Sequence, residues 1–122
     1  MKKAILLVGH GSRRDEANKA LERLCGLVGE KRGGAIVAHA YLQFAAPDLP
    51  AALGMLAATE VEEVIIVPVF LCEGVHIKED IPAILAAEAA KYPHMRLVPA
   101  PVLGIDQRMA QIVWDRVDAA HS

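Results

Sequence analysis

The stretch that decides the fold is VIIVPVFL, residues 64–71, which is apolar throughout. An aliphatic run of this length, rich in β-branched residues, predicts a strand that is buried on both faces of its sheet. Pro68 has no backbone N–H to donate to a neighbouring strand, so we expect a bulge or a local break at that residue. Doubly buried strands are typical of parallel sheets with helices on both faces.

Further runs that are largely apolar, at residues 4–8, 35–42 and 95–98, predict three more strands. Amphipathic helical patterns separate the runs, and the second of these helices is expected to start at Asp48, a good N-cap residue. The last helix is expected from about residue 105. Four alternating strands and helices predict an α/β fold with right-handed crossovers, and we expect a flavodoxin-like parallel sheet of order 2-1-3-4.

Composition narrows the class of protein. The chain has 122 residues, 54% of them hydrophobic and 23% charged, which suits one globular domain over residues 1–122. The net charge of -2 offers no basic stripe for nucleic acid. Cys25 and Cys72 are too far apart in the sequence to suggest a disulfide scaffold or zinc site. The first apolar run is too short for a signal peptide or membrane span, so we expect a cytoplasmic protein.

Ligands of open α/β sheets bind beyond the carboxyl ends of the strands, where the strand order reverses. In the expected order this point lies between the first and third strands. The loop after the first strand reads GHGSRR, residues 9–14. Its glycines leave His10 uncrowded, and Ser12 together with the next helix N-terminus offers donors to an anion. The alternative is a plain strand-to-helix turn in which Ser12 caps the helix.

The segment after the third strand reads CEGVHIKEDIP, residues 72–82. His76 is expected in a loop just past Gly74, with Asp80 capping the next helix. Alone, His76 is as readily explained as a solvated loop residue. Its predicted position beside His10, at the end of the neighbouring strand, favours a shared site.

Other polar residues give weaker signals. Gln43 either enters the site or simply closes the second strand, and Glu73 either adds a carboxylate or faces water. His39 is expected inside the second strand as a core residue, whereas His94 and His121 are expected on the surface. Cys25 belongs to the apolar stripe of the first helix, and no motif supports Cys72 as a nucleophile.

Two neutral imidazoles at one cleft suit borderline divalent metals such as cobalt, nickel or iron. Insertion of such a metal into a tetrapyrrole ring releases two pyrrole protons, which a group titrating near neutral pH can accept. Two protein ligands would leave coordination positions open for the ring nitrogens, whereas a structural metal site is closed.

Four motifs carry a family resemblance: GHGSR at residues 9–13, PVFL at 68–71, GVH at 74–76 and DIP at 80–82. Together, in this order, they resemble the short sirohydrochlorin chelatases of the CbiX/SirB type, which are class II chelatases. The resemblance covers essentially the whole chain. It implies a lyase that inserts cobalt, or else iron or nickel, into sirohydrochlorin for cobalamin-, siroheme- or F430-type cofactors. The metal is then a substrate, and no organic cofactor is implied.

The resemblance also implies residue roles. His10 and His76 would be the catalytic metal ligands and proton acceptors. Single-domain relatives form homodimers, so a homodimer is implied here, without nucleic acid or membrane partners. Sirohydrochlorin carries eight carboxylates, for which Arg13, Arg14 and Lys78 are available unless they are merely solvated. The residues expected around the substrate are Gly11, Ser12, Arg13, Gly74 and Val75, with Gln43 and Glu73 as possible auxiliary groups.

One residue departs from the family pattern, because Gln43 stands where many relatives carry glutamate. An amide neither accepts a proton nor attracts a cation as a carboxylate does. A metal- or tetrapyrrole-binding protein without catalytic activity is therefore the main alternative. A histidine phosphatase is disfavoured because Gly9 replaces the arginine of that family's Arg-His-Gly motif. A serine hydrolase is disfavoured because no G-x-S-x-G elbow is present.

Overall fold

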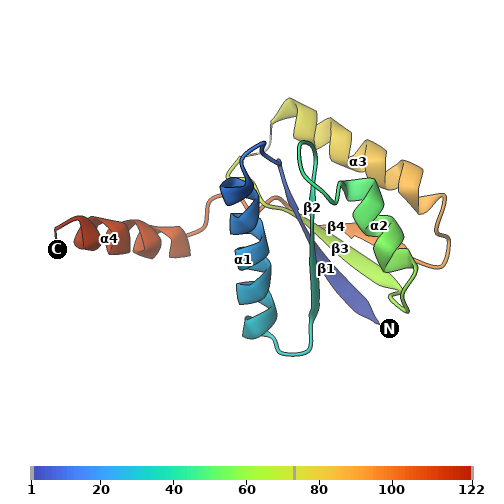
Figure 1. Cartoon of the computed structure of the whole chain (residues 1–122), viewed down its shortest axis with the longest axis horizontal. Coiled ribbons are helices and arrows are strands. Elements are labelled where there is room, and N and C mark those ends of the chain that lie inside the picture. Colours follow the sequence, from blue (N-terminus) through green and yellow to red (C-terminus); the bar gives the residue numbers. More distant parts are fainter. Residues whose placement is uncertain (1, 73, 122) are drawn as a thin grey trace.

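The computed structural model describes residues 2–72 and 74–121, and the side chain of His76 lies outside the described part. Four strands alternate with four helices, as the sequence predicts (Figure 1). In chain order the elements are β1 (Lys3–Gly9), α1 (Asp15–Lys31), β2 (Ile36–Tyr41), α2 (Leu49–Ala57), β3 (Glu63–Pro68), α3 (Val75–Ala89), β4 (Arg96–Pro99) and α4 (Arg108–Ala120).

The sheet has the order β2-β1-β3-β4 and is parallel throughout, which confirms the predicted topology. The central strands β1 and β3 contain buried aliphatic residues such as Leu6, Val64 and Ile66. Helices α2 and α3 cover one face of the sheet and α1 covers the other (Figure 1). The long crossovers needed to join parallel strands place the helices on both faces.

At Pro68, where we expected a bulge or a local break, the strand β3 ends. Pro68 is the last residue of β3 and pairs with Val8. The N–H that proline lacks is therefore missing only at the end of the hydrogen-bonded ladder between β1 and β3. The chain stays beside β1 for one more residue, because the Val69 N–H donates to the Val8 carbonyl over 2.8 Å. The proline therefore marks the edge of the sheet at which the loops begin.

Helix α3 begins earlier than the sequence suggested. We expected residues 72–78 to form a loop and Asp80 to cap the helix, but the helix starts at Val75 with Gly74 as its N-cap. Both expectations were wrong: His76 lies in the first helical turn, and Asp80 lies inside the helix. The Lys78 N–H bonds the Gly74 carbonyl over 3.0 Å, which already closes a helical turn.

Helix α4 does not cover the sheet. It extends away from the other elements (Figure 1), and none of its residues is buried. Among the residues that the structure describes, no helix is both long and apolar enough to cross a membrane.

The start of α2 agrees with the sequence. The Asp48 carboxylate accepts a hydrogen bond from the Ala51 N–H over 2.8 Å, and Pro50 lies in the first turn. We predict that Asp48→Ala lowers the free energy of unfolding by about 1 kcal/mol, because this N–H loses its acceptor. Urea denaturation measures the change. Asp48→Asn is the matched control and should retain most of the stability, since asparagine also caps helices. Equal losses in both variants would contradict a capping role.

Candidate functional site

The site is built where β1 and β3 end side by side. His10 follows the last residue of β1, and its side chain is exposed at this edge of the sheet. The extension of β3 brings Phe70 to the same place, where its ring meets the imidazole edge-on at a centroid distance of 6.1 Å. The predicted reversal of strand order thus positions His10 at the edge where ligands of this fold bind.

Gln43 is held against His10 through backbone and side chain. Its N–H donates to the His10 carbonyl over 3.2 Å, and its side-chain Nε2 lies 3.1 Å from His10 Nδ1. Gly11 permits this approach: its φ is 92°, and a Cβ there would collide with the Gln43 carbonyl oxygen. The glycine after His10 therefore serves both the left-handed turn and the close contact with Gln43.

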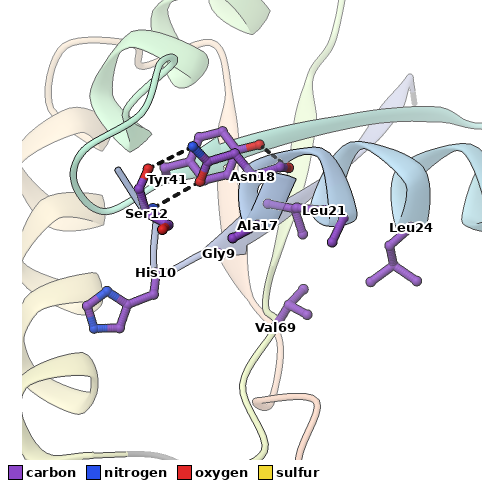
Figure 2. A pocket seen from close by; sticks show the side chains of 11 residues that line it. Gly9, His10, Ser12, Ala17, Asn18, Leu21, Leu24, Tyr41 and Val69 are labelled. Carbon is purple, nitrogen blue, oxygen red and sulfur yellow. Dashed lines mark hydrogen bonds between the residues drawn. The ribbon is translucent and has the colours of Figure 1, made fainter. Parts of the chain in front are cut away.

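Asn18 of α1 binds the backbone of the loop that follows His10, on the side of α1 (Figure 2). Its side chain accepts from the Ser12 N–H over 2.9 Å and donates to the Ser12 carbonyl over 2.8 Å. The backbone carbonyl of Asn18 in turn accepts a hydrogen bond from the Tyr41 hydroxyl over 2.7 Å. Burial, followed by the charge of Glu22, raises the pKa of the Tyr41 phenol, so the tyrosine remains a donor at neutral pH.

His10 stands between two hollows. A hollow of about 280 Å³ lies toward α3 and is lined by His10, Leu42, Gln43, Ile77 and Asp80. A second hollow, of about 370 Å³, lies toward α1 and has a mostly apolar wall that includes Leu21, Leu24 and Val69. In Figure 2 the imidazole points away from Leu21 and Leu24, toward the side of α3.

The other predicted residues of the first loop lie around His10. Gly11 and Ser12 line the hollow on the α1 side. Ser12 does not cap α1, because the N-cap is Arg14; its hydroxyl oxygen accepts from the Arg14 N–H over 3.1 Å instead. Arg13 is exposed, with its guanidinium 4.7 Å from the centre of the Phe44 ring. Arg14 is exposed as well, so both arginines lie on the surface of the loop that carries His10.

The second predicted segment is described only in part. Gly74 and Val75 are exposed at the start of α3, and Lys78 is exposed one turn later. Glu73 and the side chain of His76 lie outside the described residues. The helical backbone around His76 is described, however, and the next residue, Ile77, lines the hollow that also contains His10.

The remaining histidines lie elsewhere. His39, on β2, has Nε2 3.7 Å from a Glu22 carboxylate oxygen, while its buried Nδ1 has no hydrogen-bond partner. His94 lies within hydrogen-bonding distance of the Ala57 carbonyl, at 3.2 Å, and His121 is exposed at the end of α4. Among the side chains that are described, no three of His, Cys, Asp and Glu cluster so as to hold a metal ion.

Sequence reasoning missed Asp80 and Ile77 as site residues. It treated Asp80 as a helix cap, although helical residues three and four apart share a face. A helix starting at Val75 places His76 and Asp80 at i and i+4, so correct placement of the helix start would have identified Asp80. Asn18 gave no such signal, because its partner Ser12 lies outside the helical pattern.

Comparison with known proteins decides the family. The CbiX family matches residues 4–120. The chain belongs to the CbiX family. Among curated relatives of this CbiX member, sirohydrochlorin cobaltochelatase of Methanothermobacter thermautotrophicus is 34% identical, with 95% of this chain and 91% of the relative covered. The chloroplastic sirohydrochlorin ferrochelatase of Arabidopsis thaliana is 32% identical, with 93% of this chain and 50% of the relative covered.

Solved structures agree with the fold of this CbiX member. SirB from Bacillus subtilis with Fe3+ has a TM-score of 0.87 at 25% identity, covering 100% of this chain and 48% of that one. SirB of the subspecies spizizenii in complex with cobalt also has a TM-score of 0.87, at 27% identity, covering 98% of this chain and 51% of that one. A CbiX protein from Marinobacter aquaeolei VT8 has a TM-score of 0.81 at 26% identity, covering 97% and 96%.

Gly11→Ala tests the packing between the His10 loop and Gln43. A methyl group at this left-handed position would collide with the Gln43 carbonyl, so we predict a loss of about 1–3 kcal/mol in the free energy of unfolding. The control is Gly26→Ala in α1, where an added Cβ meets no atom within 4 Å. It should gain roughly 0.5–1 kcal/mol from helix propensity. Urea denaturation of both variants measures the difference, and an unchanged Gly11→Ala would contradict the predicted collision.

Proposed function

We propose that this chain inserts a divalent metal, primarily cobalt and alternatively iron or nickel, into sirohydrochlorin. The observation that carries the proposal is the position of His10, exposed beyond the carboxyl end of β1 and beside an open hollow that reaches α3. The names of the relatives support the same reaction, since cobaltochelatases 34% and 32% identical to this chain align with 95% and 98% of it. We assign the sirohydrochlorin-binding cleft to this edge.

In this proposal the two motif histidines act on the metal and on the ring protons. His10 and His76 present imidazole nitrogens to the incoming metal, and the open coordination positions accept the pyrrole nitrogens. As the metal passes from the imidazoles to the ring, two pyrrole N–H bonds break and metal–nitrogen bonds form. Each imidazole nitrogen that has released the metal then accepts one of the two protons and passes it to water. The reaction is neutral in electrons, so no organic cofactor is required.

The anionic substrate needs positive charge and hydrogen-bond donors at the rim. We assign Arg13, Arg14 and Lys78 to the carboxylates, because all three are exposed around the His10 edge. Gly11 and Ser12 on one side, and Gly74 and Val75 on the other, are assigned to contacts with the ring. Glu73 is proposed as an auxiliary carboxylate. We further propose a cytoplasmic homodimer that uses neither nucleic acid nor membrane as a partner.

Gln43 is proposed to position His10 rather than to bind metal. In the observed orientation its amide Nε2 faces His10 Nδ1, so the amide donates and the neutral imidazole carries its proton on Nε2. If the Gln43 amide turns by 180°, its oxygen can accept a hydrogen bond from His10 Nδ1–H. In that tautomer the Nε2 atom of His10 is unprotonated and can bind a metal ion or a proton. Gln43 is thus compatible with both states of the imidazole.

The test is to follow the absorbance of sirohydrochlorin with Co2+, Fe2+ or Ni2+ for the wild type, His10→Ala and His76→Ala. Each substitution should lower the rate of insertion by about 100-fold or more, because it removes a ligand and a proton acceptor together. His94→Ala is the control and should retain the wild-type rate. Ring binding without acceleration over the uncatalysed reaction would contradict the proposal and favour a non-catalytic binding protein.

Gln43→Glu tests the role assigned to the amide. A carboxylate accepts Nδ1–H without needing to turn and adds negative charge near the cation. We therefore predict about 10- to 100-fold tighter Co2+ binding. Titration with Co2+ at pH 8, where proton competition for imidazole is small, measures the affinity. Gln43→Leu has neither property and should bind more weakly than the wild type. Equal affinities in all three proteins would contradict a positioning role for Gln43.

A further inference from the structure

Phe44 adopts a backbone conformation that large side chains rarely take. It lies in the loop that follows β2, and its φ of 65° is in the left-handed region. The other positive φ angles among the described residues all belong to glycines: Gly11, Gly34 and Gly104. Phe44 is also 55% exposed, so burial of its ring does little to offset the strain.

The Phe44 ring contacts the side chain of Arg13. The guanidinium carbon lies 4.7 Å from the centre of the ring, which is a cation–π distance. Both side chains are exposed. At an exposed site this contact stabilises the fold by less than a bulky left-handed residue destabilises it. The stability of the fold therefore does not explain Phe44, and strain of this kind is typical of sites that hold a ligand.

The loop that carries Phe44 also contacts His10. The Gln43 N–H donates to the His10 carbonyl over 3.2 Å, and the two side chains approach to 3.1 Å. Phe44 is the next residue, and Arg13 follows His10 by three residues. The loop after β2 thus touches the first loop twice, at His10 through Gln43 and at Arg13 through Phe44.

The backbone on both sides of Arg13 is fixed. Asn18 holds the N–H and the carbonyl of Ser12 over 2.9 and 2.8 Å (Figure 2). The Arg14 N–H donates to the Ser12 hydroxyl oxygen over 3.1 Å. The long Arg13 side chain remains, and ordering such a side chain lowers its entropy. Because Phe44 already restricts the guanidinium, less entropy is lost when a ligand binds.

Phe44 orients the guanidinium without using its hydrogen-bond donors. Within the described part of the chain, the Arg13 guanidinium forms no hydrogen bond or ion pair. Asp15 and Glu16, in the first turn of α1, are close in sequence but are not paired with it. A carboxylate partner would occupy the donors and offset the charge. A neutral aromatic face leaves both available to a carboxylate of a ligand.

We propose that Phe44 is a positioning residue for the substrate. It holds Arg13 where the guanidinium binds one peripheral carboxylate of the tetrapyrrole while the centre of the ring lies over His10. Because Arg13 and His10 belong to one fixed loop, this contact orients the ring relative to the metal. The proposal rests on the proposed function, since it takes the anionic tetrapyrrole as ligand, and it adds the residue that prepares the arginine.

Equilibrium dialysis of metal-free sirohydrochlorin, followed by absorbance, tests the proposal without requiring metal insertion. We expect Phe44→Leu, which keeps an apolar side chain but loses the aromatic face, to raise the dissociation constant about 3- to 5-fold. Arg13→Gln should raise it about 10- to 100-fold, because a charge-assisted hydrogen bond is lost. Phe44→Tyr is the matched control and should stay within about 2-fold of the wild type, because it keeps the aromatic face.

A double-mutant cycle shows whether Phe44 acts through Arg13. In the Arg13→Gln background, Phe44→Leu should change the dissociation constant by less than about 1.5-fold, because no guanidinium is left to position. An equal effect in both backgrounds would overturn the proposal, since the ring of Phe44 would then act on the substrate directly. An unchanged dissociation constant for the single variant Phe44→Leu would overturn it as well.

Phe44→Gly tests whether the ring is needed for folding instead. Glycine takes a left-handed φ without strain, and this gain offsets its greater freedom in the unfolded chain. We therefore expect the urea midpoint of unfolding to stay near that of the wild type, while the dissociation constant rises as in Phe44→Leu. A fall of more than about 0.5 M urea would assign Phe44 to stability and overturn the proposal.

The insertion rate separates this proposal from the proposed function. With Co2+, Phe44→Leu should raise KM by the same factor as the dissociation constant and leave kcat within about 2-fold. If the wild type binds the ring but does not accelerate insertion, the proposed reaction fails while the role of Phe44 is still decided by binding. Normal insertion with equal binding by Phe44→Leu gives the reverse result. A wild type that does not bind sirohydrochlorin would overturn both.

Discussion

The pairing of β1 with β3 is the constraint on which the rest of the structure depends. Parallel pairing from Lys3–Glu63 to Val8–Pro68 makes both strands end at the same edge. The next chain segments must then start side by side, one with His10 and the other with Phe70 and the start of α3. Both strands are rich in buried aliphatic residues, so the hydrophobic core that stabilises the sheet also positions the site.

Much of this arrangement could be predicted because it follows from short-range patterns. Aliphatic runs predict buried strands, alternation with helices predicts parallel topology, and topology predicts where His10 lies. The start of α3 was not predictable in the same way. Gly74 caps the helix with its backbone alone, so no side chain marks the boundary. Asp80 looked like a cap for that reason, and its contribution to the hollow beside His10 was missed.

The position of α4 was beyond sequence reasoning for another reason. Its amphipathic pattern correctly predicts a helix, and such a pattern indicates that one face is buried but not by which molecule. The hydrogen bonds of residues 100–104 along β3 determine the direction of α4, and these are backbone contacts that the sequence does not mark. Gln43 is similar, because its contact with His10 depends on the absence of a Cβ at Gly11.

The central claim is that two imidazoles, one from the loop after β1 and one from the first turn of α3, bind the same metal ion. Anomalous diffraction at the cobalt edge, from crystals of the chain grown with Co2+, tests it most directly. The account predicts a single strong peak within bonding distance of His10 and His76. A peak bound to only one of these histidines, or located at His39 or His94 instead, would contradict it.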